Sequence, residues 1–503
     1  MEQKQLSKER GKQILLWIFK RFMEISRDSE KIYMGFPDDL PPHYAYEAVQ
    51  IFNDCNGFPE FVPNDEKAAT LGSGLWLSKG NDWREIPFYA EENEKIEHKL
   101  QKREMYKIMS QYTGYKSPWG CMTGVRPAKI VNGLYASGYS FEEAVTELED
   151  FYMAEHEKAV LAAQVARNQD VFLRTQKEHP ENVSIYIGIP FCPTRCLYCS
   201  FTSHPIAKYA KRVNDYLDML ETELKKVIPV IIEKGYKIES LYIGGGTPTS
   251  LSETDFARFM DFVTKIIKVD GLKEFSLEAG RPDSITRAKL ETAKSVGVSR
   301  ISVNPQTMND KTLELIGRRH TAKQIEVAFE EARNVGFHNI NMDIIAGLPG
   351  ENVSDFEYTL EKICKMAPDG LTVHTLSVKR AADLKRDAKA ELLKHDITGK
   401  MLSLAQNAAK GMNMHPFYMY RQKNMLGNHE NVSYCKEGLE SPYNIHIMEE
   451  DQSIFAFGAG GVTKLCKEID GERKIVRSFN VKGVEDYMRR FEEMADRKIE
   501  LIL

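Results

Sequence analysis

Short apolar runs alternate with amphipathic stretches through the middle of the chain. The runs are rich in Ile, Leu and Val and are followed by Gly or Pro, which is typical of short buried strands. They occupy residues 184–189, 240–244, 274–278, 300–304, 339–345 and 371–377. The stretches between them place apolar residues at helical spacing with charged residues on the remaining positions. These stretches occupy residues 208–234, 253–268, 284–296, 309–334 and 353–366.

Six strands that alternate with helices predict successive right-handed βαβ units and a parallel sheet, which is an α/β fold. Functional side chains in such sheets gather at the C-terminal ends of the strands. Polar or glycine-rich segments should therefore meet at one rim where they directly follow the predicted strands.

The flanking regions follow a different pattern. Helical segments dominate residues 1–180, for example 141–175, and no chemistry is assigned there. After about residue 380 a helix is predicted near 395–411, strands around 415–421 and 453–457, and a helix at 484–497. A chain of 503 residues is too long for one ordinary core. We therefore expect three domains: an α-rich accessory domain at 1–180, a core at 181–380 and an α+β domain at 381–503.

Composition narrows the class of protein. Apolar residues make up 42% and charged residues 28% of the chain, as in soluble globular proteins. A formal charge of −5 gives no support for a nucleic-acid binder held by bulk charge. No apolar run approaches the roughly 18 residues of a membrane span, and no signal-peptide cleavage site is evident. We expect a cytoplasmic protein without a membrane span and without a nucleic-acid partner.

Three of the eight cysteines are clustered directly after the first predicted strand. Cys192, Cys196 and Cys199 have the spacing C-x3-C-x2-C. Three thiolates can bind three irons of a cubane cluster and leave the fourth iron open to another ligand. Soft thiolates also bind zinc, in which case His204 is the nearest fourth ligand.

Other strands are followed by residues suited to ligand binding. The segment Gly244-Gly-Gly-Thr-Pro-Thr249 follows the second strand, and its glycines let the backbone approach a ligand closely. It lacks the lysine of a P-loop, so binding of a nucleoside triphosphate is not expected. Glu278 ends the third strand and Asp343 lies in the fifth. The alternatives are a simple tight turn for the glycines, and strand-end salt bridges or caps for the carboxylates.

The segment Tyr186-Ile-Gly-Ile-Pro-Phe-Cys192-x3-Cys196-x-Tyr198-Cys199 resembles the radical S-adenosylmethionine (SAM) superfamily. More narrowly, it resembles the oxygen-independent coproporphyrinogen III oxidase (coproporphyrinogen dehydrogenase) family. Within that family it is most similar to the HemZ-like subfamily, which carries an extra N-terminal region. The resemblance covers residues 183–465 and implies an incomplete (β/α)6 barrel whose open mouth the C-terminal domain covers.

The resemblance also implies cofactors and the residues that hold them. It implies a [4Fe–4S] cluster on the three clustered cysteines, and SAM beside it. The residues assigned to SAM through the resemblance are Tyr186, Tyr198, Gly245, Gly246, Thr247, Glu278, Gln306, Arg318 and Asp343. Arg318 matches a family arginine that meets the cofactor's carboxylate, a charge-assisted pairing. For Gln306 and Arg318 the alternative is a structural salt bridge or cap, and both tyrosines could be core residues.

The implied activity is oxidative decarboxylation of coproporphyrinogen III. The radical formed from SAM removes a hydrogen from a propionate, and loss of CO2 and one electron leaves a vinyl group. Two rounds give protoporphyrinogen IX in porphyrin and heme biosynthesis. The implied partners are a tetrapyrrole substrate and a reducing electron donor such as a flavodoxin or ferredoxin.

Two positions depart from the pattern of the family. Gly188 stands where relatives commonly have His, and Phe201 stands where decarboxylating members have a further cysteine. Phe201 is more like the heme-chaperone branch. That branch carries a His-Asn-x-x-Tyr-Trp element, whereas the nearest stretch here, residues 430–435, lacks both the aligned His and the Trp. A heme chaperone and another tetrapyrrole-directed radical enzyme therefore stay open as alternatives.

Overall fold

The computed structural model describes most of the chain from residue 116 onward and five strands before it. The described residues are 22–27, 30–35, 60–62, 75–79, 82–86, 99–100, 102–104, 106–107, 110–111, 116–124, 126–199, 201, 203–377, 397–422 and 425–503. They form two compact units. The first contains residues 1–127, 133–163 and 427–429, and the second contains residues 128–132, 164–426 and 430–503. The three-domain division expected from the sequence stays a prediction.

Six parallel strands form the centre of the second unit, and they pair in the order in which they occur in the sequence. They are β6 (Asn182–Ile189), β9 (Lys237–Gly245), β10 (Glu274–Glu278), β11 (Arg300–Ser302), β12 (Ile340–Ala346) and β13 (Gly370–Thr375). Each lies within about three residues of a strand predicted from the apolar runs. The predicted α/β fold with a parallel sheet is confirmed.

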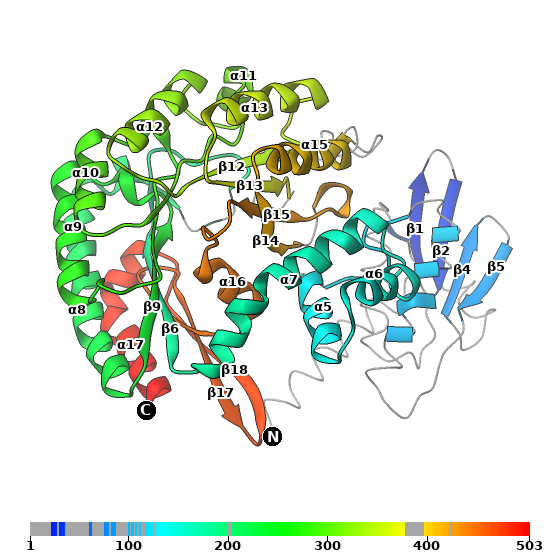
Figure 1. Ribbon diagram of the computed structural model, residues 1–503, viewed down its shortest axis with the longest axis horizontal. Coiled ribbons are helices and arrows are strands. Elements are labelled where there is room, and N and C mark those ends of the chain that lie inside the picture. Colours follow the sequence, from blue (N-terminus) through cyan, green and yellow to red (C-terminus); the bar gives the residue numbers. More distant parts are fainter. Residues whose placement is uncertain are drawn as a thin grey trace. The chain divides into compact units, whose positions relative to one another are not determined.

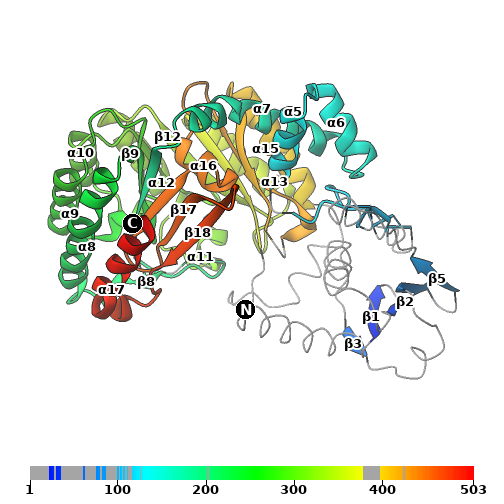
Figure 2. The ribbon, with the colours of Figure 1, turned by 90° about the horizontal axis from the view of Figure 1, so that it is seen from below.

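Helices connect these strands and cover the sheet (Figure 1). They are α8 (Val213–Glu233), α9 (Glu253–Ile266), α10 (Arg287–Ser295), α11 (Asp310–Leu315), α12 (Ala322–Asn334) and α13 (Val353–Met366). Figures 1 and 2 both show α8, α9 and α10 side by side along one side of the sheet. Apolar side chains such as Leu217, Leu220 and Leu224 of α8 are fully buried. The parallel strands are buried on both faces, which explains why their sequences are nearly continuous apolar runs.

Local capping explains where several of these helices begin. Ser252 accepts a hydrogen bond from the backbone of Asp255 at the start of α9. Thr321 and Gln324 form a capping box at the start of α12. The helix predicted over 309–334 is therefore two helices, α11 and α12, and the segment between them carries Arg318 and His320.

Strands from the C-terminal part extend the same sheet at both edges to eleven strands. On one edge, β15 (Asn431–Cys435) pairs antiparallel with β13, and β14 (His415–Tyr420) pairs with β15. On the other edge, β16 (Ser453–Phe457) runs parallel to β6 and is followed by the hairpin of β17 (Val462–Ile469) and β18 (Glu472–Phe479). The predicted strands at 415–421 and 453–457 correspond to β14 and β16.

The described chain also contains six further helices, four short 3-10 turns and one pair of short strands. The helices are α5 (Pro127–Ala136), α6 (Phe141–Asp150), α7 (His156–Glu178), α15 (Ile397–Gly411), α16 (Pro442–Glu449) and α17 (Val484–Ile502). The 3-10 turns are η1 (Ile206–Lys208), η2 (Pro248–Ser250), η3 (Pro282–Ser284) and η4 (Leu426–Asn428). Two short strands, β7 (Phe191–Cys192) and β8 (His204–Pro205), pair with each other.

The first unit contains an antiparallel sheet that the sequence analysis did not predict. Its strands pair in the order β3-β1-β2-β4-β5. They are β1 (Phe22–Arg27), β2 (Glu30–Gly35), β3 (Glu60–Val62), β4 (Leu75–Lys79) and β5 (Asp82–Ile86). Strands this short give weak periodic signals, so their pairing depends on tertiary contacts. The helical prediction over 141–175 corresponds to α6 and α7.

Candidate functional site

The cysteine loop lies at the C-terminal end of the first parallel strand and contacts the segment after β9 and the end of helix α11. Cys192 ends β7, and its Sγ is 3.4 Å from the Thr247 hydroxyl of the glycine-rich segment. The backbone N–H of Gly246 donates to Ile189 at 2.8 Å, and that of Thr247 donates to Phe191 at 2.7 Å. The Leu197 N–H donates to Ile316. The loop is therefore tied to the glycine-rich segment after β9 and to the C-terminal end of helix α11 (Asp310–Leu315).

Gly246 has no room for a side chain. A Cβ there would lie 2.5 Å from the Phe191 carbonyl oxygen and 3.0 Å from Cys192 Sγ. Gly245 has φ +104°, which other residues rarely adopt. The glycines thus permit the close approach of the second strand end to the cysteine loop.

The cysteines Cys192, Cys196 and Cys199 are free and half-buried. Burial raises the pKa of Cys192 to about 11 and also raises that of Cys199. Among the described residues, the one set of three potential ligands whose donor atoms all lie within 4.8 Å is His415, Cys435 and Glu440. The three loop sulfurs do not all lie within 4.8 Å of one another. Three sulfurs bound to one zinc ion, with Zn–S bonds of about 2.3 Å, would have to lie that close. A cubane holds its ligands on different irons, so the wider spacing fits an iron–sulfur cluster.

The set His415, Cys435 and Glu440 has a simpler explanation than metal binding. The His415 Nε2 atom is 2.8 Å from a Glu440 carboxylate oxygen, which is an ordinary ion-pair distance. Burial raises the pKa of Cys435, whose thiol packs in a cluster with Phe417 and Ile445. We interpret the set as a histidine–carboxylate pair beside a protonated thiol.

Glu278 lies at the end of β10 in a ring of hydrogen-bond donors. The Tyr242 hydroxyl donates to its Oε1, as does the Ser302 hydroxyl at 3.1 Å, and the Asn304 amide is 3.3 Å from Oε2. Burial raises the pKa of Glu278, and the negative charge of Asp343 raises it further. This pKa shift marks Glu278 as a functional candidate.

The pKa of Asp343, in β12, is shifted in the opposite direction, to a lower value. Burial works to raise its pKa, but His374, 3.5 Å away, and the Asn341 amide, 2.7 Å away, outweigh burial and lower it. Gln306 is joined to the same strand by its backbone: its N–H donates to the Asp343 carbonyl at 2.9 Å. Gln306 has φ +68°, an uncommon conformation for a residue with a side chain, held here by the strand.

Arg318 is buried in the segment between α11 and α12. Its guanidinium donates to the Asn304 carbonyl and interacts with Tyr198 and Cys196. Within the described part of the chain, the buried polar atoms without a hydrogen-bond partner include Gln306 Oε1, Asn304 Oδ1 and Arg318 Nε in this region. Buried polar atoms are normally paired, so these point to a polar ligand.

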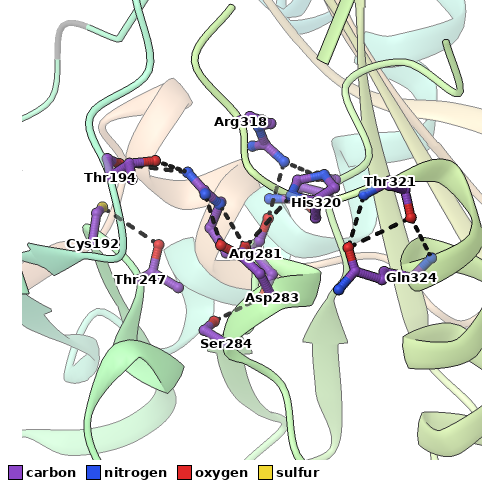
Figure 3. Close-up of polar contacts among 12 residues, drawn as sticks. Cys192, Thr194, Thr247, Arg281, Asp283, Ser284, Arg318, His320, Thr321 and Gln324 are labelled. Carbon is purple, nitrogen blue, oxygen red and sulfur yellow. Dashed lines mark hydrogen bonds and ion pairs between the residues drawn. The ribbon is translucent and has the colours of Figure 1, made fainter. Parts of the chain in front are cut away.

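The structure brings the residues predicted from the sequence into one region, the C-terminal ends of the parallel strands. Tyr186 takes a different surrounding from Tyr198: its ring stacks with those of Tyr242 and Tyr443, at centroid distances of 6.4 and 6.3 Å. The sequence analysis missed Tyr242, although it is the direct partner of Tyr186 on the neighbouring strand. It also missed Arg281, three residues after Glu278. Figure 3 shows Arg281 beside Thr194 and Asp283.

Comparison with known proteins agrees with this geometry. The sequence profile of the radical SAM superfamily matches residues 186–363. The oxygen-independent coproporphyrinogen-III oxidase-like protein HemZ of Bacillus subtilis is 39% identical over 397 residues, which are 78% of this chain and 79% of that protein. The heme chaperone HemW of the same organism is 33% identical over 55% of this chain and 69% of that one.

Among solved structures, the coproporphyrinogen III oxidase HemN of Escherichia coli matches 65% of this chain and 73% of its own, with 21% identity and a TM-score of 0.48.

The parallel α/β core with its cysteine loop is that of a radical SAM protein. The chain belongs to the oxygen-independent coproporphyrinogen III oxidase family, in its HemZ-like branch. Its cofactors are accordingly a [4Fe–4S] cluster and SAM. None of the helices that the structure describes is long and apolar enough to cross a membrane.

Proposed function

We propose that the protein converts propionate side chains of coproporphyrinogen III to vinyl groups without oxygen, giving protoporphyrinogen IX. The observation that carries the proposal is a set of polar side chains beside the three-cysteine loop. They are Glu278 at the end of β10, Gln306 after β11, Asp343 in β12, and Arg318 between α11 and α12. A relative named as an oxidase-like protein, similar over 79% of its length, supports the choice of substrate.

In this proposal Cys192, Cys196 and Cys199 hold the cluster. Their thiols are free and share one loop, so they would bind three irons of a cubane cluster. When bound there, the cluster and SAM would supply the radical chemistry needed to remove a hydrogen from the propionate. A low-potential protein such as a flavodoxin or ferredoxin would deliver the electron for the cluster.

The chain's own residues orient SAM. Glu278 and Asp343 offer carboxylates to its hydroxyl and amino groups, while Arg318 offers a cation to its carboxylate. The unpaired Gln306 Oε1 and Asn304 Oδ1 offer acceptors. Gly245, Gly246 and Thr247 let the backbone approach the methionine end, while Tyr198 lies beside Arg318 and Cys196. Tyr186, stacked on two other tyrosines, forms an aromatic wall that helps to exclude water.

A heme chaperone is the second candidate, because Phe201 replaces the further cysteine of decarboxylating relatives and HemW is 33% identical. Phe201 is 72% exposed, so it does not serve as a core residue. Against this candidate, the stretch that corresponds to the heme-binding element is buried: Glu430, directly before β15, is 1% exposed, and Tyr434 in β15 is 4% exposed. A heme ligand must be accessible to heme.

One experiment separates the two candidates. The cluster is reconstituted anaerobically, and reductant, SAM and coproporphyrinogen III are added. The oxidase proposal predicts 5′-deoxyadenosine together with vinyl products. Formation of 5′-deoxyadenosine without a vinyl product would reject the substrate. Tight stoichiometric heme binding without turnover would favour the chaperone.

A further inference from the structure

Arg281 contacts the cysteine loop although it belongs to a different strand-to-helix connection. Arg281 lies in the loop after β10 and is only 3% exposed. One guanidinium nitrogen, Nη1, donates to the Thr194 hydroxyl at 3.1 Å and to Cys196 Sγ at 3.6 Å. Figure 3 shows this guanidinium between Thr194 and Asp283.

The opposite side of the guanidinium is fixed by a carboxylate. Asp283 accepts two parallel hydrogen bonds, from Arg281 Nε and from Nη2, each of 2.9 Å. The buried His320 lies 3.4 Å from the same carboxylate. A bidentate pair of this kind leaves the arginine little rotational freedom, so the remaining nitrogen is held toward the cysteine loop.

The contact distinguishes Cys196 from its two neighbours. Cys192 Sγ has a neutral hydroxyl partner, Thr247, and Cys199 is next to the Ser203 side chain. Cys196 instead receives a charged donor from Arg281, in addition to its interaction with Arg318. Arg318 is the proposed partner of the SAM carboxylate, whereas Arg281 is not assigned to SAM and donates directly to Cys196.

We propose that Arg281 is a positioning residue that raises the reduction potential of the cluster through its hydrogen bond to Cys196. Reduction adds one negative charge, part of which resides on the cysteine sulfurs. A buried cation that donates to one of these sulfurs stabilises the reduced cluster more than the oxidised one. The inference rests on the proposed ligand role of Cys196, and it is independent of which tetrapyrrole the protein acts on.

The test is a redox titration of the reconstituted full-length protein, followed by the electron paramagnetic resonance signal of the reduced cluster. No SAM or tetrapyrrole is added, so the result does not depend on the proposed reaction. The variants are Arg281→Gln, Arg281→Lys and Arg287→Gln. Arg287 is the matched control, because it lies six residues away on the surface and pairs with Glu291.

Arg281→Gln should lower the ratio of reduced to oxidised cluster at a fixed potential about tenfold, which is about 59 mV for one electron. Arg281→Lys should fall between this variant and the native protein, and Arg287→Gln should match the native protein. Thr194→Val removes the loop's hydrogen bond but keeps the cation, so it should leave the potential nearly unchanged.

An unchanged potential in Arg281→Gln would overturn the proposal and leave Arg281 a structural support of the loop. An equal decrease in Thr194→Val would do the same, because it would assign the effect to loop geometry. If neither Arg281 variant retains iron and sulfide, Arg281 is required to assemble the cluster and the tuning role is rejected. A full cluster in Cys196→Ala would instead show that the ligand assignment is wrong.

Discussion

At the scale of single residues, Glu278 and Asp343 show how two carboxyl groups in one site acquire opposite pKa shifts. Both are half-buried, Glu278 at the end of β10 and Asp343 within β12, but His374 and Asn341 stabilise the charge on Asp343. Glu278 receives neutral donors only, and the charge on Asp343 adds to the cost of its ionisation. Glu278 therefore takes up a proton at a higher pH than Asp343 does.

This separation leads to a pH-dependent prediction for SAM binding. Because the pKa of Glu278 is raised, its carboxylate becomes protonated at a higher pH than that of an ordinary glutamate. If the carboxylate accepts from SAM, the affinity for SAM falls as the pH is lowered toward that raised pKa. Glu278→Gln should weaken binding about 10- to 100-fold at neutral pH and remove most of this pH dependence. Calorimetric titration of the cluster-loaded protein at several pH values measures both effects, and an unchanged pH profile in the variant would contradict the assignment.

Gly246 gives a second prediction at this scale. A Cβ at Gly246 would overlap the Phe191 carbonyl at 2.5 Å, so the end of β6 or the cysteine loop must move. We expect Gly246→Ala to lose most of its iron and sulfide after reconstitution. Gly133→Ala is the control, because no atom lies within 4 Å of the added Cβ in helix α5. Normal cluster content in Gly246→Ala would show that the close approach is dispensable.

At the scale of elements, the C-terminal helix α17 is joined to α8 by a buried ion pair. Lys498 Nζ is 2.6 Å from Glu223, and both side chains have no exposed surface. The Glu223 carboxylate also accepts from the Tyr487 hydroxyl at 2.6 Å and from the Gly458 N–H at 3.0 Å. Gly458 follows β16, so this pair connects two helices with the loop after an added strand of the sheet.

Removing the cation should therefore destabilise the second unit. Lys498→Met leaves a buried carboxylate without its counter-ion, which costs about 3–5 kcal/mol. The double variant Glu223→Gln with Lys498→Met should recover part of that loss. Arg489→Gln on the exposed face of α17 serves as the control and should have little effect. Urea unfolding followed by circular dichroism measures the differences, and equal midpoints for all variants would refute the role of the pair.

Many of the elements could be predicted because their signals are local. The six parallel strands and helices α9 and α13 lie where apolar periodicity and capping residues place them. The predicted helix at 309–334 was interrupted because the capping box of Thr321 and Gln324 begins a new helix. Strands β15, β17 and β18 were missed, since the stability of a strand depends on packing against its partners as well as on its own pattern.

At the scale of the whole molecule, the proposed SAM site joins residues in or directly after five of the parallel strands to the cysteine loop. Binding should thus stabilise the folded chain as a unit. At SAM concentrations about 100-fold above the dissociation constant, the stabilisation is about 2.7 kcal/mol. Thermal unfolding of the cluster-loaded protein with and without SAM should show this increase. A variant with all three cysteines replaced by alanine should show a smaller one, because the open iron no longer binds SAM. An equal increase would argue against contact between SAM and the cluster.

The sequence by itself determined the βαβ order, the cysteine spacing and the identity of the strand-end residues, because each of these depends on neighbours within a few positions. It also sufficed to recognise the family. The tertiary structure decided which distant segments meet. The pairing of β16 with β6, the stacking of Tyr186 on Tyr242 and Tyr443, and the contact of Arg281 with Cys196 join residues that are 56 to 270 positions apart. Contacts between residues this far apart in the sequence form only when the backbone is folded. Local sequence patterns therefore cannot predict them.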